Sequence, residues 1–147
     1  MKKKIVFLVG VAIVLLICGI VYYRPVSLSS TVSENSNILV VLSDTAFEGR
    51  RNDVFEEEDI SAEQKSAIFS VFEEYSYRRT FGTPFSDGSL SETGYVLELS
   101  IYIAEENSFH SIMMTSSGNL VVNGKNYRMK NAERFINQID EILSPVI

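Results

Sequence analysis

The first hydrophobic pattern of the chain is an apolar run from Ile5 to Tyr23 that contains no charged residue. A helix needs about 20 such residues to cross the hydrocarbon core of a bilayer. Thirteen of these 19 residues are Ile, Val, Leu or Phe, and together they favour insertion by about 4 to 8 kcal/mol. The pattern therefore predicts a membrane anchor within residues 1–24. Its apolar residues include Ile5, Val9, Leu15 and Ile20.

The charges that flank this run predict its orientation. Three lysines at positions 2–4 precede it, whereas Arg24 alone follows it. Because cytoplasmic flanks are enriched in Lys and Arg, we expect the N-terminus in the cytoplasm, with Tyr22 and Tyr23 at the outer interface of the membrane. The expected arrangement is a single-pass protein of the cell membrane, with the bilayer around its N-terminal helix and the rest of the chain outside.

Two other interpretations of the run remain open. A cleaved signal peptide has a shorter apolar region followed by a small-x-small cleavage site, and the one such sequence here, Ser27-Leu28-Ser29, lies several residues beyond the run. A lipoprotein would use Cys18 as its acylated residue, but Ile17 is bulkier than the small residue that precedes such a cysteine. An uncleaved anchor fits the length of the run best.

The residues after the anchor divide into a short polar segment and one domain. Residues 25–36 are rich in Ser, which predicts a flexible stalk. Residues 37–147 are enough for a single hydrophobic core. Within them, residues 37–43 are apolar at successive positions, which is typical of a central strand covered on both faces. Residues 44–59 give no clear pattern.

The first helix of the domain is predicted to begin after Ser61, which forms a capping box with Gln64. Two arginines, Arg78 and Arg79, would lie at its C-terminal end, where the helix dipole favours cations. The apolar positions of the helix recur with helical spacing, at Ile68, Val71, Phe72 and Tyr75. Residues 81–92 are expected to form a loop.

Four strands are predicted next, over 95–103, 108–115, 119–122 and 125–129, because apolar and polar residues alternate between turn sequences. The turns are expected at 106–107, at 116–118 and at Asn123-Gly124, a strong hairpin signal. They set a testable register. It pairs Val122 with Lys125, Leu120 with Tyr127, Met114 with Leu120, Ile112 with Val122, Ile101 with Ile112, and Leu99 with Met114.

A second amphipathic helix closes the chain, with Asn131 as its cap and Pro145 as its stop. Both helices have one apolar side and the sheet has one strongly apolar face. The expected fold is therefore α+β, a two-layer domain of a mainly antiparallel sheet of about five strands with both helices on one face. The order of elements is strand, helix, four strands, helix.

Charge and composition narrow the possible partners. All 19 acidic residues follow Arg24 but only nine basic residues do, so the domain carries a net charge of −10. Nucleic acids, anionic membranes and anionic wall polymers are repelled by such a surface, and we expect no nucleic-acid partner. The domain contains no cysteine, so disulfides do not contribute to its stability.

Catalytic, metal and cofactor motifs are not evident in the sequence, so no catalytic residue, metal ligand or cofactor is predicted. His110, the only histidine, is expected to be a partly buried edge residue opposite Ile103. The acidic run at 56–59 fits a solvated helix start better than a calcium loop. A hydrolase of the cell envelope is one alternative, and it would require Glu98, Glu106 and His110 to cluster.

The sheet face away from the helices is the one surface that stands out. It is expected to carry Tyr102, Phe109, Met113 and Val121 among polar residues, and a partly apolar open face is typical of protein-binding surfaces. We therefore predict a protein- or peptide-interaction module, with an inhibitor, immunity, sensor or accessory role. A small-ligand-binding domain with residues 44–59 or 81–92 as a lid is a further alternative.

The layout resembles the small uncharacterised membrane-anchored ectodomains common in Gram-positive bacteria. The resemblance rests on the three lysines with the apolar run, and on the sequence from Gly118 to Tyr127 followed by a terminal amphipathic helix. It implies a domain displayed outside the membrane. It supplies no catalytic residues.

Overall fold

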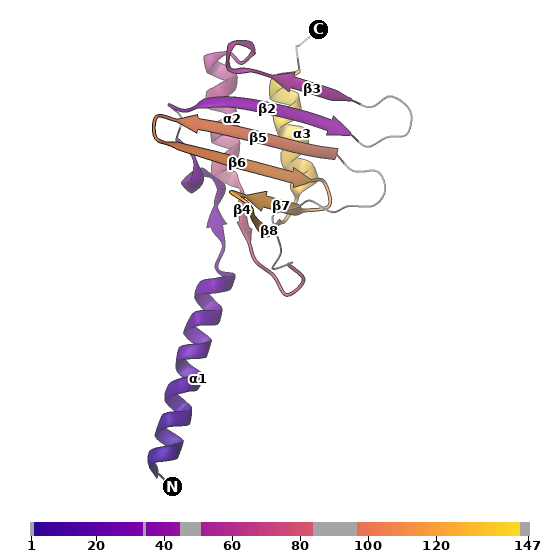
Figure 1. Cartoon of the computed structure of the whole chain (residues 1–147). Coiled ribbons are helices and arrows are strands. Elements are labelled where there is room, and N and C mark those ends of the chain that lie inside the picture. Colours follow the sequence, from indigo (N-terminus) through magenta and orange to yellow (C-terminus); the bar gives the residue numbers. More distant parts are fainter. Residues whose placement is uncertain (1, 34, 45–50, 84–96, 145–147) are drawn as a thin grey trace.

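The computed structural model describes residues 2–33, 35–44, 51–83 and 97–144 of the chain, and shows a long N-terminal helix that projects from an α+β domain (Figure 1). The helix α1 (Lys2–Tyr23) is, in the described part of the chain, the one helix long and apolar enough to cross a membrane. None of the residues in its most apolar stretch is buried against the rest of the protein. Signal sequences share this length and composition.

The domain contains one antiparallel sheet, and the described residues contribute eight strands to it in the order β1-β4-β8-β7-β6-β5-β2-β3. The strands are β1 (Val26–Ser27), β2 (Asn37–Asp44), β3 (Asn52–Phe55), β4 (Ser76–Arg78), β5 (Leu97–Glu105), β6 (Ser108–Thr115), β7 (Asn119–Val122) and β8 (Lys125–Met129).

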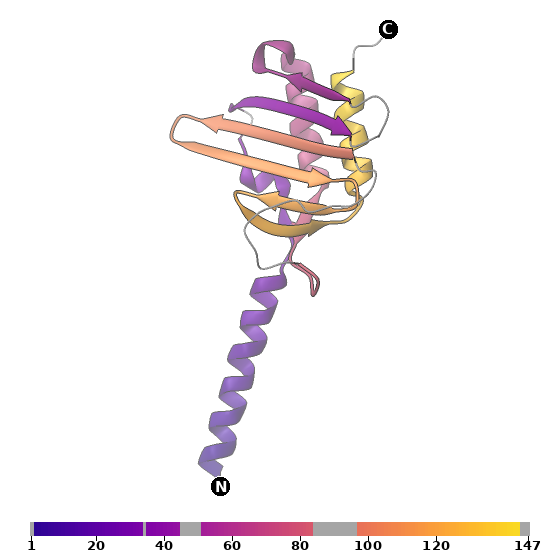
Figure 2. The ribbon, with the colours of Figure 1, turned by 45° about the vertical axis from the view of Figure 1, so that its right-hand side comes forward.

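Two helices, α2 (Ala62–Glu74) and α3 (Ala132–Leu143), lie on the same face of the sheet (Figures 1 and 2). Two short 3-10 helices, η1 (Leu28–Thr31) and η2 (Glu57–Asp59), complete the described elements. The predicted two-layer α+β arrangement is therefore confirmed, whereas the strand count was too low.

The predicted register of the last four strands is confirmed at all six residue pairs. The turns that set it have the expected geometry, because Asn123 and Gly124 both have positive φ, as does Gly118 in the preceding loop. These φ values are those of a two-residue hairpin turn and of a three-residue loop with glycine in the left-handed region. Local turn chemistry thus fixed the alignment of strands that share one apolar face.

The strands missing from the prediction are the three short ones, β1, β3 and β4. They contain two to four residues each, too few to produce a readable alternation. Strand β7 is as short as β3, but the turn sequences on both sides of it made it predictable. The first strand of the expected order, β2, pairs with β5 and is antiparallel to it. The helix α2 does not connect these two strands directly, because β3 precedes it and β4 follows it.

The segment expected to be a flexible stalk is instead part of the domain. β1 pairs with β4, and Leu28 of η1 is fully buried in the core. The backbone N–H of Leu28 donates a hydrogen bond of 3.0 Å to the carbonyl of Tyr75. The serines that suggested flexibility surround Leu28, and Val26 and Val32 also pack against the core. Burial of these side chains orders the segment.

The first helix of the domain ends earlier than predicted. Its capping box between Ser61 and Gln64 is confirmed, but the helix ends at Glu74, and Tyr75 has extended backbone angles. Tyr77 then pairs with Val26 and Met129 as part of β4. Burial of both Tyr75 and Tyr77 requires the period of a strand rather than that of a helix. Arg78 and Arg79 therefore do not cap a helix.

The core lies between the sheet and the two helices. Phe72 of α2 stacks on Phe135 of α3 at 5.9 Å between ring centroids, and Tyr75 contacts the same ring edge-on at 5.0 Å. The Tyr75 hydroxyl donates a hydrogen bond to Gln138. The sheet contributes Ile38, Val40, Leu42, Leu99, Ile101, Ile103, Ile112, Met114, Leu120 and Val122, all buried.

Asn131 precedes α3 as predicted, but it acts differently. It adopts a left-handed conformation with φ of 58°, and its side chain makes no capping hydrogen bond.

Several predicted features lie outside the described residues, namely Tyr95 at the start of a strand, Pro145, residues 84–92 of the expected loop and residues 45–50 of the unassigned stretch.

Candidate functional site

The sheet face opposite the helices carries a row of aligned side chains that crosses several strands. Val54 of β3 pairs with Val41 of β2, Val41 pairs with Ser100 of β5, and Ser100 pairs with Met113 of β6. Their alternation with the buried residues of the same strands places them on the open side. This face lies in front of α2 and α3 in Figure 1.

A second line of side chains flanks this row. Leu39 pairs with Tyr102, and Ala104 pairs with Phe109. The ring of Tyr102 stacks on that of Phe109 with 6.1 Å between centroids, and the Tyr102 hydroxyl approaches the sulfur of Met113 at 4.0 Å. Aromatic side chains and a methionine are therefore in mutual contact on the open face. We define the open-face patch as Leu39, Val41, Val54, Tyr102, Phe109 and Met113.

The exposure of these side chains makes the patch accessible. Phe109 is 64% exposed and Val54 is 48% exposed, and the other four are half-buried. Soluble domains seldom leave aromatic and aliphatic side chains together in contact with water, because burying them is favourable. The patch therefore has the composition of a binding surface.

Val121 does not belong to this patch, although its predicted pairing with Met113 is confirmed. It points to the open side but is fully buried, as are Thr115 and Asn126 on the same face. A buried side chain cannot contact a partner directly. The exposed patch is thus formed by β2, β3, β5 and β6.

Three members of the patch, Leu39, Val41 and Val54, were missed at the level of sequence. The signal for Leu39 and Val41 was the run at 37–43, in which successive residues are apolar. This run predicted a strand that is covered on both sides. In the structure one side of β2 is buried and the other is half-exposed. Val54 lies on β3, within the stretch that gave no clear pattern.

The residues of the hydrolase alternative do not form a single cluster. Glu98 lies near the start of β5 and Glu106 directly follows its end, eight residues further on, which is about 26 Å along an extended chain. His110 pairs with Ile103 near the Glu105 end and is half-buried, as expected. Its Nδ1 lies 3.1 Å from the side-chain nitrogen of Asn123. The arrangement required for the alternative is therefore absent from these residues.

Glu105 instead holds the segment that precedes β2. Its carboxylate accepts hydrogen bonds from the Ser36 hydroxyl at 3.0 Å, the Ser33 backbone N–H at 3.2 Å and the Ser108 hydroxyl at 2.9 Å. The bonds from Ser108 and Ser36 lower the pKa of Glu105. This carboxylate is already occupied by structural contacts.

The acidic run at 56–59 also has structural contacts. Glu57 accepts hydrogen bonds from the backbone N–H of Ile38 at 2.6 Å and from the ammonium of Lys65 at 2.7 Å. Burial raises the pKa of Glu57, but the bonds from Lys65 and Ile38 outweigh it and the net shift is downward. The run thus joins the start of β2 to α2.

Among the described residues, no group of three or more His, Cys, Asp or Glu side chains could hold a metal ion.

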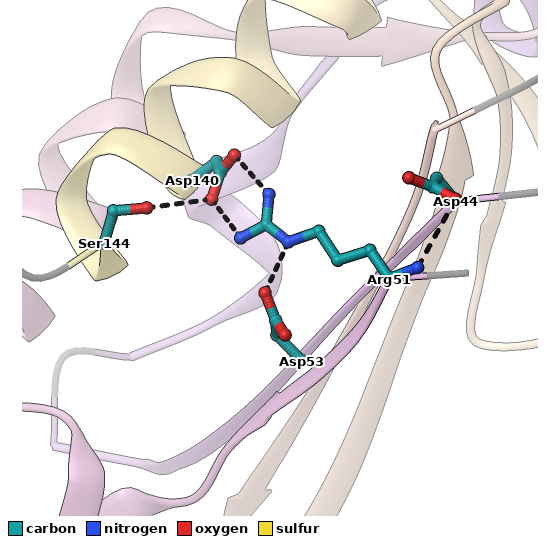
Figure 3. Close-up of polar contacts among 5 residues, drawn as sticks. All are labelled: Asp44, Arg51, Asp53, Asp140 and Ser144. Carbon is teal, nitrogen blue, oxygen red and sulfur yellow. Dashed lines mark hydrogen bonds and ion pairs between the residues drawn. The ribbon is translucent and has the colours of Figure 1, made fainter. Parts of the chain in front are cut away.

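A polar cluster joins the β3 edge of the sheet to α3 (Figure 3). Arg51 donates two hydrogen bonds of 2.6 Å to Asp140 and a third to Asp53, and Ser144 donates to Asp140 at 3.2 Å. The bond from Arg51 lowers the pKa of Asp140 although partial burial opposes it. The backbone N–H of Arg51 donates to Asp44 at 3.4 Å. The cluster positions the strand that carries Val54.

The predicted anchor residues Ile5, Val9, Leu15 and Ile20 are all exposed along α1, as expected of side chains that face lipid. Tyr22 and Tyr23 lie at its C-terminal end and contact each other edge-on at 5.0 Å. The fold and the site together define a small α+β domain with an exposed apolar sheet face, carried on one apolar helix. No family model, curated protein or solved structure matches the chain.

Proposed function

We propose that this protein is a single-pass membrane protein that displays a protein- or peptide-binding domain outside the cell. The observation that carries the proposal is the open-face patch, in which stacked Tyr102 and Phe109 lie beside Met113 and continue across β2 to Val54. Tyr, Phe and Met are enriched at the centres of protein interfaces. For such a surface we propose an inhibitor, immunity, sensor or accessory role.

The location of the domain is supported by the flanks of α1. Lysines at positions 2–4 precede the apolar segment and the two tyrosines end it, which is the pattern of a helix with its N-terminus in the cytoplasm. The short connection from Tyr23 to β1 keeps the domain next to the bilayer. In this arrangement the open-face patch faces sideways along the membrane, since the open face of the sheet is turned toward the viewer in Figure 1 while α1 runs down the page.

The partner is expected to offer an apolar surface with neutral or basic surroundings. The domain carries a net charge of −10, which favours association with positively charged proteins over acidic ones. Glu98 of β5 lies on the same side of the sheet as Ser100 and Tyr102, so the charge complementarity would extend to the rim of the interface.

Site-specific photo-cross-linking in intact cells tests this proposal. A benzophenone amino acid replaces Phe109 or, as the control, Asn137 on the exposed side of α3. We expect one discrete cross-linked product from position 109 and none from position 137. Products of equal yield from both positions would contradict a specific surface.

The partner captured in this way then allows an affinity test. We expect Phe109→Ala, and Tyr102→Ala together with Met113→Ala, to weaken binding at least about tenfold, because truncated aromatic anchors dominate binding energy. Asn137→Ala together with Arg134→Ala on α3 is the matched control and should leave affinity unchanged. Unchanged affinity in the patch variants would refute the assignment of this face.

A further inference from the structure

The turn that follows β4 presents an aromatic side chain beside the end of α1. The backbone N–H of Thr83 donates to the carbonyl of Thr80 at 3.0 Å, and the Thr83 hydroxyl accepts from the N–H of Thr80 at 2.8 Å. These bonds close a turn with Phe81 and Gly82 at its tip. Phe81 is 97% exposed, although burying a phenyl ring is strongly favourable.

Direct contacts fix this turn against the C-terminal end of α1. The ring of Phe81 stacks on that of Tyr23 with 5.9 Å between centroids. Arg79 donates a hydrogen bond of 2.6 Å to the hydroxyl of Tyr22 and lies 4.8 Å from the centre of that ring. The turn and the end of α1 lie at the same level in both views (Figures 1 and 2). Phe81 thus extends the aromatic pair at the end of the apolar helix.

A cationic hollow lies next to the same turn. It encloses about 290 Å³ between β4, β8 and the start of β1, and three cations line it, Arg78, Arg128 and Lys130. The remaining lining residues are Pro25, Ser76, Thr80 and Met129, none of them acidic. This concentration of positive charge contrasts with the net charge of −10 on the domain.

Two of these cations occupy directly opposed positions. Arg78 pairs with Arg128 across β4 and β8, and like charges at such positions destabilise a sheet. In the described part of the chain, neither of them nor Lys130 forms an ion pair with a carboxylate. An anion between the two guanidinium groups would relieve their repulsion, and phosphate is the anion that arginine binds best through its planar fork.

We propose that this end of the domain is a second membrane contact, in which Phe81 enters the headgroup region and Arg78, Arg128 and Lys130 bind the phosphates of anionic phospholipids. The inference rests on the proposed function in one respect, since α1 must cross the bilayer for this end to face the outer leaflet. Aromatic side chains favour the membrane interface, and basic residues are attracted to anionic lipid surfaces. The two contacts would hold the domain in one orientation and keep the open-face patch away from the lipid.

Tryptophan fluorescence of the full-length protein tests the aromatic contact, because the chain contains no tryptophan. Three single-tryptophan variants, Phe81→Trp, Phe109→Trp and Ile13→Trp, are reconstituted into vesicles of phosphatidylcholine and phosphatidylglycerol. The phosphatidylcholine is brominated near the headgroup end of one acyl chain in one set of vesicles, which reports on positions 81 and 109. It is brominated near the methyl end in a second set, which reports on position 13 at the middle of α1. We expect quenching of at least half of the fluorescence at position 81 and almost none at position 109.

The three positions separate the possible failures. Phe109 is a matched control, since it is an exposed phenylalanine on β6, which is three strands from β4 in the sheet order. Ile13 reports on the span itself. Quenching at position 13 without quenching at position 81 would overturn this proposal and leave the anchor intact. Absence of quenching at position 13 would overturn the anchor and this proposal together, without touching the binding role of the open-face patch.

The charged contact is tested by varying the lipid and the arginines. We expect quenching at position 81 to fall at least twofold in vesicles without phosphatidylglycerol. Arg78→Gln and Arg128→Gln, singly and together, should produce the same fall in the anionic vesicles. Arg134→Gln on the exposed side of α3 is the matched control for the single variants and should change nothing. Quenching that is independent of phosphatidylglycerol and of these arginines would refute phosphate binding.

Discussion

The guanidinium of Arg51 and the carboxylate of Asp140 form a two-point ion pair, with both nitrogen–oxygen distances at 2.6 Å. The pair connects residues 89 positions apart and holds the β3 edge against α3. A two-point contact depends on the planar fork of arginine. The contribution of this ion pair to stability is limited, because both side chains are about one-third exposed to solvent, at 33% and 30%.

We therefore predict that Arg51→Lys lowers the free energy of unfolding by about 1 kcal/mol, because lysine keeps the charge and loses the fork. Chemical denaturation of the full-length protein in detergent, followed by circular dichroism, measures the change. A double-mutant cycle with Arg51→Ala and Asp140→Ala is the control. Strictly additive effects in that cycle would show that the pair contributes nothing.

The same pair makes stability depend on pH. Arg51 holds the pKa of Asp140 below its ordinary value of 3.8 in the folded protein. The ionised carboxylate therefore stabilises the fold above that value, and the stabilisation is lost as the pH falls through the lower pKa of the folded state. We predict a loss of stability below about pH 4 that is smaller in Asp140→Asn. Denaturation midpoints measured across this range test it, and parallel curves for both proteins would contradict it.

The part of the fold that could be predicted is the part governed by local rules. Asn123-Gly124, Gly118 and the capping box at Ser61 fixed the hairpins and one helix start, because turn and cap chemistry depends on adjacent residues. Strand β4 was missed because Tyr75 and Tyr77 are buried by tertiary contacts. Nothing local in the sequence indicates which partners those rings meet.

The candidate site could likewise be predicted only where it depends on local sequence patterns. Tyr102, Phe109 and Met113 follow from alternation within well-defined strands. Val121 has the same alternation but is buried, and periodicity gives the side of a sheet without giving its exposure. The hollow beside Arg78 was missed, since its cations come from two strands paired only in the fold.

Gly118 provides a further test of the fold, because the backbone around it has no room for a side chain. Its φ is 96°, and a Cβ at this position would lie 2.6 Å from the carbonyl oxygen of Met129. We predict that Gly118→Ala lowers the free energy of unfolding by about 2 to 3 kcal/mol, the sum of left-handed strain and this contact. Denaturant unfolding measures the change.

Gly124 is the matched control for this substitution. It also has positive φ, at 75°, but nothing lies within 4 Å of the position of a Cβ. Gly124→Ala should therefore lose only the conformational part, about 1 kcal/mol. Equal losses at the two glycines would mean that the close approach to Met129 carries no energetic weight.

Substitution of Leu28 tests whether the segment after α1 is a flexible tether or part of the domain. Its side chain is fully buried in the core, whereas Val26 and Val32 on either side of it are only partly buried. We predict that Leu28→Ala lowers the free energy of unfolding by about 2 to 4 kcal/mol, because it leaves a cavity in the packed interior. Ser30→Ala, at an exposed position of the same short helix, should change stability by less than about 0.5 kcal/mol. If the segment were a flexible stalk, neither substitution would change the free energy of unfolding. The domain would then turn freely above the membrane instead of presenting one face along it.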